Sequence, residues 1–258
     1  MLEDPFEATD VLVFADVLAR APRAPVTALL GPLFEALLES PAKATASGYL
    51  PPGLCATIER RVYEEHGVLP FERQRPKVTS ESAFMSLHVA RLVATFAGLM
   101  RKHRGTFQLT RKGRASFERH GLAGVYPALL RTYATRLEWS SLDGFPRVPI
   151  VQASFAFALV LLVRFGHSTR PATFYVERWL RAFPGIEDVF EPLVPVTTAG
   201  RSRVDARGQF EHCFRGRVLE RFFAYFGLAE VRAEPRGRSV SVRATPLLHD
   251  VVALRHGG

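Results

Sequence analysis

The chain has 258 residues, 47% of them hydrophobic, and a formal net charge of +9. A composition this apolar excludes wholesale disorder, and the length suits one large domain or two small ones. The two cysteines are too few for a disulfide scaffold or a four-cysteine zinc site.

The charge is distributed unevenly along the chain. Residues 1–70 carry a net charge of −5, residues 71–150 carry +9, and residues 151–258 carry +5. This asymmetry predicts either a polyanionic partner for the basic part or an acidic region that folds against it. A compositional explanation also stands, because 30 of the 34 basic residues are arginine. A GC-rich genome produces such a bias without any nucleic-acid role.

The N-terminus and the longest apolar run indicate where in the cell the protein is expected. The N-terminus is acidic and lacks a charged-then-apolar secretory leader. The run from Val148 to Val163 has 16 residues, whereas a membrane span needs roughly 18–20 clean apolar residues. We therefore expect a cytoplasmic protein without a membrane partner, in which this run is a buried helix.

The first half of the chain predicts a short extension followed by one module. Residues 1–28 are expected to form an N-terminal helical extension, with a helix over 10–20. Residues 29–121 give helix, helix, helix, two-stranded hairpin and helix, which is the order of a winged helix-turn-helix module. The helices are expected over 29–40, 52–66, 80–97 and 110–121, with an exposed loop over 68–80 and the hairpin over 99–110.

Particular residues set the boundaries of these elements. Ser80 or Ser82 is suited to cap the third helix, and Gly98 is suited to end it. Thr110 is suited to cap the fourth helix, directly after the hairpin.

The second half predicts a connector and a second module. Residues 122–150 form a helical connector, with a helix over 122–142 and a turn at 143–146, and residues 151–258 form a second winged-helix-like module. The expected fold class is therefore mainly α with small β-hairpins (α+β), in two winged helix-turn-helix-like modules joined by a helical connector. The elements of the second module are expected as helices over 155–165, 172–183, 211–226 and 245–254, a loop over 192–209, and a hairpin over 229–244.

An internal repeat supports two modules of one kind. Residues 89–99 and 218–228 each form a predicted helix that ends in Gly-Leu and precedes a basic hairpin, a threonine and a further helix. The two glycines are 129 residues apart and the two threonines 135, so the second hairpin is about six residues longer.

Several stretches resemble a bacterial family of unknown function. They are TASGYLP at 45–51, the hairpin at 98–114, LEWSSLDGFP at 137–146, the helix at 174–184, and Phe-Gly-Leu at 226–228. The resemblance covers about residues 40–230 and implies a winged-helix-like architecture and a cytoplasmic bacterial protein, but no activity. The family has Asn-Trp and Asp-Gly-Tyr-Pro where this chain has Glu138-Trp139 and Phe145, so any role of that asparagine does not carry over.

The first predicted hairpin and the start of the next helix are the most basic stretch. Six arginine and lysine residues fall within 14 positions. In a winged helix the third helix enters the major groove and the hairpin touches phosphates, which need such cations. Alternatively, the same residues are ordinary guards of an exposed strand edge. The six are Arg101, Lys102, Arg104, Arg111, Lys112 and Arg114.

Further arginines extend the candidate nucleic-acid surface. Arg91 lies on the third helix, which otherwise carries only His88 as a basic residue and so offers a poor surface for reading bases. The second module contributes candidates from its long helix and its hairpin, namely Arg215, Arg217, Arg221, Arg236 and Arg238.

Motifs for catalysis, metals and cofactors are missing from the sequence. It has no HExxH, no phosphate-binding glycine loop and no Gly-x-Ser-x-Gly elbow. The sequence therefore predicts a non-enzymatic nucleic-acid-binding protein without cofactor or metal, with duplex DNA favoured, acting as a regulatory or accessory protein. The alternative is a protein–protein interaction module, a homodimer or a subunit of a larger system, in which the acidic first 70 residues neutralise the basic hairpins.

Overall fold

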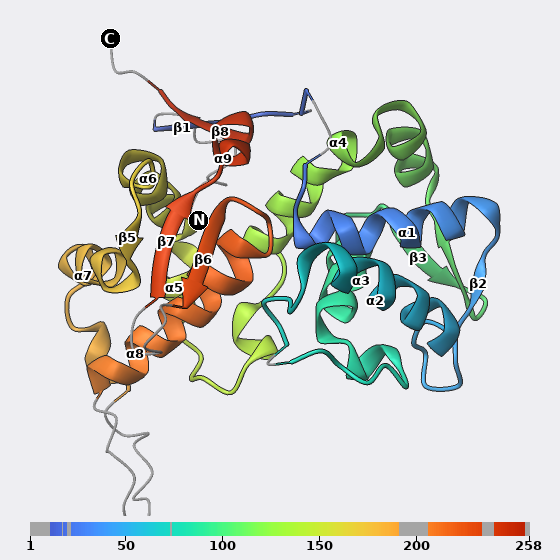
Figure 1. The fold of residues 1–258 in the computed structure, drawn as a ribbon, viewed down its shortest axis with the longest axis horizontal. Helices are drawn as coiled ribbons and strands as arrows, with labels where there is room; N and C mark the ends of the chain where they lie inside the picture. The colour runs from blue at the N-terminus through green and yellow to red at the C-terminus, as the bar shows by residue number, and fades with distance from the viewer. Residues whose placement is uncertain are drawn as a thin grey trace, which may run out of the picture.

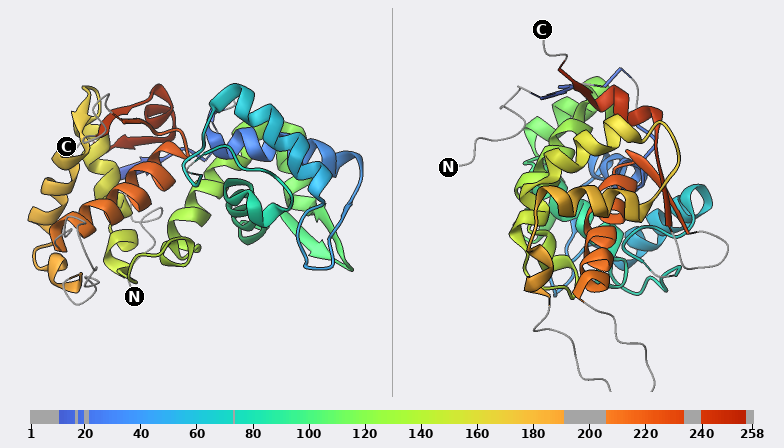
Figure 2. Two further views of the ribbon diagram at one scale, coloured as in Figure 1. Left: turned by 60° about the horizontal axis from the view of Figure 1, so that its bottom comes forward. Right: turned by 90° about the vertical axis from the view of Figure 1, so that its left-hand side faces the viewer.

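The computed structural model describes residues 11–16, 18–19, 22–72, 74–190, 206–233 and 240–255. The chain is mainly helical and contains small antiparallel sheets, which confirms the expected α+β class. Two groups of elements lie side by side, one from each half of the chain, and the long helix α4 (Arg111–Thr135) connects them (Figures 1 and 2).

The first half packs three helices against a three-stranded sheet. α1 lies against both α2 and α3, and the sheet has the order β2-β4-β3. The predicted hairpin is confirmed: Arg104 and Gly105 form its turn with φ angles of 47° and 74°, the conformation that a two-residue hairpin needs. The bounds are α1 (Pro25–Glu39), β2 (Ala42–Lys43), α2 (Pro52–His66), the 3-10 turn η1 (Glu81–Ala83), α3 (Met85–Phe96), β3 (Met100–His103) and β4 (Thr106–Leu109).

The second half has the same order of elements around the sheet β5-β7-β6. Its long helix is α-helical at first and then continues as a π-helix. The predicted helices at 155–165 and 172–183 and the second hairpin are confirmed, the helices to within a residue. The bounds are η2 (Trp139–Leu142), α5 (Pro149–Ala153), α6 (Phe155–Phe165), β5 (Arg170–Pro171), α7 (Ala172–Ala182), η3 (Ile186–Val189), α8 (Ala206–Phe214), the π-helix η5 (Arg215–Ala224), β6 (Ala229–Ala233) and β7 (Val240–Ala244).

The two repeated stretches make the same hydrogen bonds. Gly98 and Gly227 lie in the left-handed region, with φ angles of 71° and 69°. In both stretches the amide of the next leucine donates to the carbonyl five residues back, at 2.9 and 2.8 Å, as in a Schellman helix end. The hydroxyls of Thr110 and Thr245 donate to the two glycine carbonyls at 2.6 and 2.5 Å. The sequence similarity therefore corresponds to one local construction used twice.

The predicted helix over 10–20 is wrong where the structure describes it. Residues 12–14 form the strand β1 (Leu12–Phe14), which pairs antiparallel with β8 (Val252–Leu254). Leu12 is buried whereas Val13 is exposed, an alternation that suits a strand and not a helix. The same pairing shortens the last predicted helix, since α9 (Pro246–Val251) ends where β8 begins. Residues 1–10, 17, 20 and 21 of the predicted extension lie outside the described ranges.

Several helix boundaries also differ from the prediction, beginning with α1, which starts at Pro25 and not at residue 29. Neither Ser80 nor Ser82 caps α3, which begins at Met85 because Glu81 turns into a buried polar cluster instead of opening the helix. The predicted helices on either side of Gly121 are merged into α4, with a break at this glycine (φ 58°, ψ −144°), and α4 stops at Thr135. The helix predicted over 211–226 starts earlier, at the beginning of α8, and the loop predicted over 192–209 lies outside the described ranges as far as residue 205.

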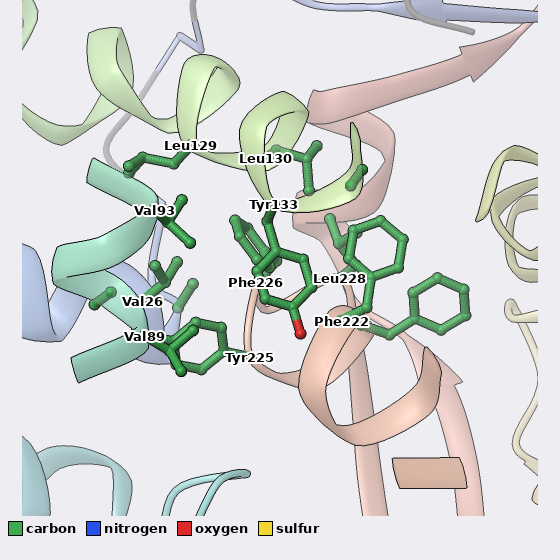
Figure 3. Packing of buried hydrophobic residues seen from close by; sticks show 14 of the residues in the cluster. Val26, Val89, Val93, Leu129, Leu130, Tyr133, Phe222, Tyr225, Phe226 and Leu228 are labelled. Carbon is green, nitrogen blue, oxygen red and sulfur yellow. The ribbon is translucent and has the colours of Figure 1, made fainter. Parts of the chain in front are cut away.

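One hydrophobic core runs through both halves. Figure 3 shows Tyr133 of α4 among the valines of α3 and the aromatic side chains of Phe222, Tyr225 and Phe226. Two buried tyrosine hydroxyls donate across the boundary at 2.7 Å, from Tyr126 to the Phe226 carbonyl and from Tyr225 to the Ser86 carbonyl. The two halves are therefore packed as a single body.

The start of α4 tolerates no side chain larger than hydrogen at Gly113. A Cβ atom built there would lie 1.9 Å from the Leu99 carbonyl oxygen, which is backbone and cannot rotate away. We expect Gly113→Ala to lower the free energy of unfolding by about 3 kcal/mol in urea denaturation. Gly53→Ala, also in a first helical turn but with open space around it, should be neutral or slightly stabilising. Equal effects of the two substitutions would contradict this account.

Candidate nucleic-acid interface

The register of the first sheet gathers basic side chains on its outer face. Lys43 of β2 lies opposite Thr106 of β4, which in turn lies opposite His103 of β3. Arg101 lies opposite Gln108. It is two residues before His103 on β3, so its side chain lies on the same face of the sheet as that of His103. We call Lys43, Arg101, Lys102, His103 and Arg104 the hairpin surface.

The side chains of the hairpin surface are exposed and carry unneutralised charge. All five residues are exposed to solvent. Within the part of the chain that the structure describes, no carboxylate pairs with Lys43, Arg101, Lys102 or Arg104. Lys102 lies on the opposite face of its strand, where its Nζ atom covers Gly48. Such cations attract a polyanion without first giving up an internal partner.

Sequence reasoning missed Lys43 as a member of this surface. It lies 58 positions before Arg101 in the chain, and only the pairing of β2 with β4 brings the two together. The available signal was weak: a short Ala-Lys-Ala-Thr stretch between two helices, with one of only four lysines in the chain.

The three cations at the start of α4 are exposed but differ in their surroundings. Arg114 pairs with Glu118 one turn later, at 3.3 Å. Lys112 lines a hollow together with Asp16, on the side of the β1–β8 pair. Arg111 is paired with no carboxylate among the residues whose positions are described, and it occupies the first helical position, where the helix dipole disfavours positive charge. Arg111 therefore adds a further cation close to the hairpin.

Arg91 does not face solvent. It is 8% exposed, and its Nε atom donates to Glu81 Oε1 at 2.6 Å. His88 Nδ1 lies 2.6 Å from the same oxygen, and the amide of Leu50 donates to the other oxygen at 2.7 Å. Burial alone would raise the pKa of Glu81, but these hydrogen bonds and the Arg91 charge outweigh it and hold the pKa below its ordinary value. Arg91 thus completes an internal cluster and is not available to phosphate.

The arginines of η5 are also directed inward. Arg217 is 2% exposed and makes a bidentate pair with Asp143, at 2.8 Å from Nε and 2.7 Å from Nη2. Arg221 donates to the Leu142 carbonyl at 3.0 Å, and Arg215 pairs with Glu220 at 3.2 Å. Arg217 and Arg221 fix the 142–146 turn to η5. The prediction that Arg217 contacts phosphate is wrong because its charge is already neutralised in the interior.

The remaining candidates, Arg236 and Arg238, lie outside the described residues. The structure thus brings Arg101 and Arg104 near Lys43, with Lys102 on the other face of the same hairpin and Arg111 nearby. It separates Arg91, Arg215, Arg217 and Arg221 from them.

Other parts of the molecule give weaker indications of a ligand-binding, metal or catalytic site. A groove of about 620 Å³ runs along residues 134–155, but Gln152 at its base is fully engaged with Trp139 N, Ala134 O and Leu137 O. Among the residues with described positions, no three His, Cys, Asp or Glu side chains come together as metal ligands. Burial raises the pKa of both Cys55 and Cys213 to about 12, so neither thiol is poised as a nucleophile. Over the same ranges, no helix is long and apolar enough to cross a bilayer.

Comparisons with protein-family models, curated proteins and solved structures find no match to this chain. The resemblance to an uncharacterised bacterial family therefore stays a prediction, and the argument on function depends on the site itself.

The Glu81 cluster predicts an acid-sensitive contribution to stability. Because the pKa of Glu81 is lower in the folded than in the unfolded chain, its carboxylate stabilises the fold above the unfolded pKa and loses this effect as the pH falls. Between about pH 5 and about pH 3, Glu81→Gln should therefore lose less unfolding free energy than the wild type in urea titrations. The exposed Glu39→Gln is the control and should follow the wild type. Parallel profiles for wild type and Glu81→Gln would contradict the assignment.

The Asp143–Arg217 pair predicts a large stability effect. Asp143→Ala leaves the buried guanidinium of Arg217 without its counter-charge, which we expect to cost about 3–5 kcal/mol in chemical denaturation. The exposed pair of Glu138 and Arg147 provides the comparison, since Glu138→Ala should cost at most about 1 kcal/mol. Similar losses for both variants would show that the Asp143 pair is not the buried contact described here.

Proposed function

We propose that this protein binds duplex DNA through the hairpin surface, as a non-enzymatic regulatory or accessory protein built from two winged-helix modules. The observation that carries the proposal is the set of exposed cations on one hairpin without internal counter-charges. Between residues 101 and 114 the sequence has six arginine and lysine residues and no acidic residue.

Phosphate is the ligand chemistry that suits this surface. Duplex DNA is a dense row of negative charges, and lysine or arginine contacts release its bound counterions, which dominates affinity. Arginine and lysine on a hairpin reach phosphates from long flexible stems. Ordinary edge guarding needs one or two charges on an exposed strand, whereas β3 has Arg101, Lys102 and His103 in succession.

The order of elements supports the winged-helix part of the proposal. In the first half the chain runs α1-β2-α2-α3-β3-β4, and the short strand β2 pairs with β4, the last strand of the hairpin. The second half runs α6-β5-α7-α8/η5-β6-β7 with the same pairing of β5 and β7. A helix-turn-helix followed by a hairpin wing has this connectivity.

The cellular setting that we propose is the cytoplasm. Cys55 and Cys213 are both free and buried, which suits a reducing compartment that contains DNA.

The alternative of a protein-interaction module predicts that acidic residues of the first 70 positions neutralise the hairpin. Among the described residues of this region no carboxylate pairs with a hairpin cation, and two pair elsewhere, Glu35 with Arg61 at 3.0 Å and Glu59 with Arg75 at 2.5 Å. This observation favours nucleic acid over an internal neutralisation of the hairpin. A protein partner or a second copy of the chain becomes the leading candidate if the experiment below finds no binding.

Fluorescence anisotropy with a duplex DNA at several salt concentrations tests the proposal. The triple variant Arg101→Ala, Lys102→Ala, Arg104→Ala should bind more weakly. It should also lower the slope of log affinity against log salt by up to about 3, since each phosphate contact adds about 0.9.

The control variant removes three exposed arginines of the second half, Arg147, Arg164 and Arg181, none of which lies on a hairpin. It lowers the net charge by the same amount and should retain most of the slope. Loss of slope in both variants would indicate a diffuse charge effect and not a hairpin site. An undetectable interaction at low salt would refute nucleic-acid binding.

A further inference from the structure

The helix that would read bases in the first module, α3, is packed between the two halves. Its Ser86 carbonyl accepts from Tyr225 at 2.7 Å, and Phe71, beside α3, packs edge to face on Tyr225 at 4.9 Å. Met85 and Phe96, at the two ends of α3, are its only exposed residues, and both are apolar. α3 thus presents no polar stripe to solvent.

The polar side chains of α3 are all engaged inside the protein. Ser86 donates its backbone amide and its hydroxyl to Glu72, and Arg91 and His88 both meet Glu81. The Thr95 hydroxyl donates to a carbonyl of its own helix at 2.8 Å. Direct base readout needs several free donors and acceptors that converge on a base edge, and the partly exposed His88 alone does not supply such a set.

The corresponding helix of the second module consists of α8 and η5, and its η5 part is likewise packed between the two halves. Phe222 and Phe226 face Tyr133 in the core (Figure 3), and Arg217 is bound to Asp143. Arg215 and Arg221 are occupied by Glu220 and by the 142–143 turn. Neither α3 nor η5 can enter a groove unless the two halves separate, whereas α8 keeps Arg207 and His212 at the surface.

We infer that the protein binds the sugar-phosphate backbone of duplex DNA without selecting a base sequence. This inference rests on the proposed function, because it specifies how the hairpin surface engages its ligand. Phosphate contacts position a protein on DNA but carry no sequence information, and the free cations lie on the hairpin and not on α3 or η5. The chemical class of the ligand is therefore the duplex backbone itself, with affinity set by charge and by salt.

The test is a comparison of duplexes of equal length in the same anisotropy assay with the full chain. The set contains a GC-rich duplex, a mixed-sequence duplex and a duplex with a central A-tract, together with a selection from a random-sequence library. We expect dissociation constants within about threefold of one another, equal salt slopes, and no enriched motif.

Two results would overturn the inference. An enriched motif or a tenfold preference would require contacts to base edges, and so the release of α3 or η5 from the interface. A preference for the A-tract alone would mean that hairpin arginines enter and read a narrow minor groove. Both results leave DNA binding intact, whereas failure to bind any duplex refutes the proposed function, so the two failures are distinguishable.

A pair of surface variants tests the role of α3 directly. Met85→Ala and Phe96→Ala change the only exposed side chains of this helix and leave its internal polar network in place. Affinity should stay within twofold of the wild type for each. A loss of affinity as large as that of the hairpin triple variant, in a variant with an unchanged circular dichroism spectrum, would place α3 in contact with the DNA and overturn the inference.

Discussion

The structure depends most on the aromatic packing between its two halves. Tyr133 of α4 stacks on Phe222 at 5.9 Å and lies 5.0 Å from Phe226, while Tyr225 extends from η5 to the backbone of α3. These large side chains are buried, and burial of an aromatic side chain contributes more than most other contacts to holding a core together. The hydroxyls of Tyr126 and Tyr225 donate to backbone carbonyls across the seam, which offsets the cost of burying them. Because the seam is built from α3 and η5, it withdraws both helices from the surface.

The fate of each arginine follows from the carboxylates within its reach. Arg217 is buried because Asp143 accepts two close hydrogen bonds from it, and Arg91 because Glu81 accepts one from its Nε atom, which compensates the cost of removing these charges from water. The cations of the hairpin surface have no such neighbours among the described residues and stay in solvent. The high positive charge of residues 71–150 is therefore not one surface. It divides into an internal part that fixes the fold and an external part that remains available to a ligand.

Local signals in the sequence predict local structure well here. The Gly98 and Thr110 boundaries and the turn at Arg104-Gly105 depend on residues within a few positions, and all three are found where the sequence places them. The errors come from distant partners. Residues 12–14 suit a helix or a strand by composition, and their pairing with residues 252–254, at the other end of the chain, decides for the strand. Likewise, nothing near Arg217 in the sequence announces Asp143, which is 74 positions away.

Among the described residues, the two hairpins differ in the charge that they leave exposed, although they are built in the same way. Both halves use the same glycine, leucine and threonine bonds to attach a hairpin to a helix, so the scaffold alone does not distinguish them. The exposed residues of the two hairpins, in contrast, distinguish the two halves. In the second hairpin Arg232 pairs with Glu230 at 2.8 Å, and Arg243 lies opposite Glu230 across the strands, whereas the first hairpin has no carboxylate at all. The two copies of one scaffold thus differ in unpaired positive charge among their described residues, and unpaired positive charge attracts a polyanion. The function of the protein is accordingly to be sought where the two copies differ and not in what they share.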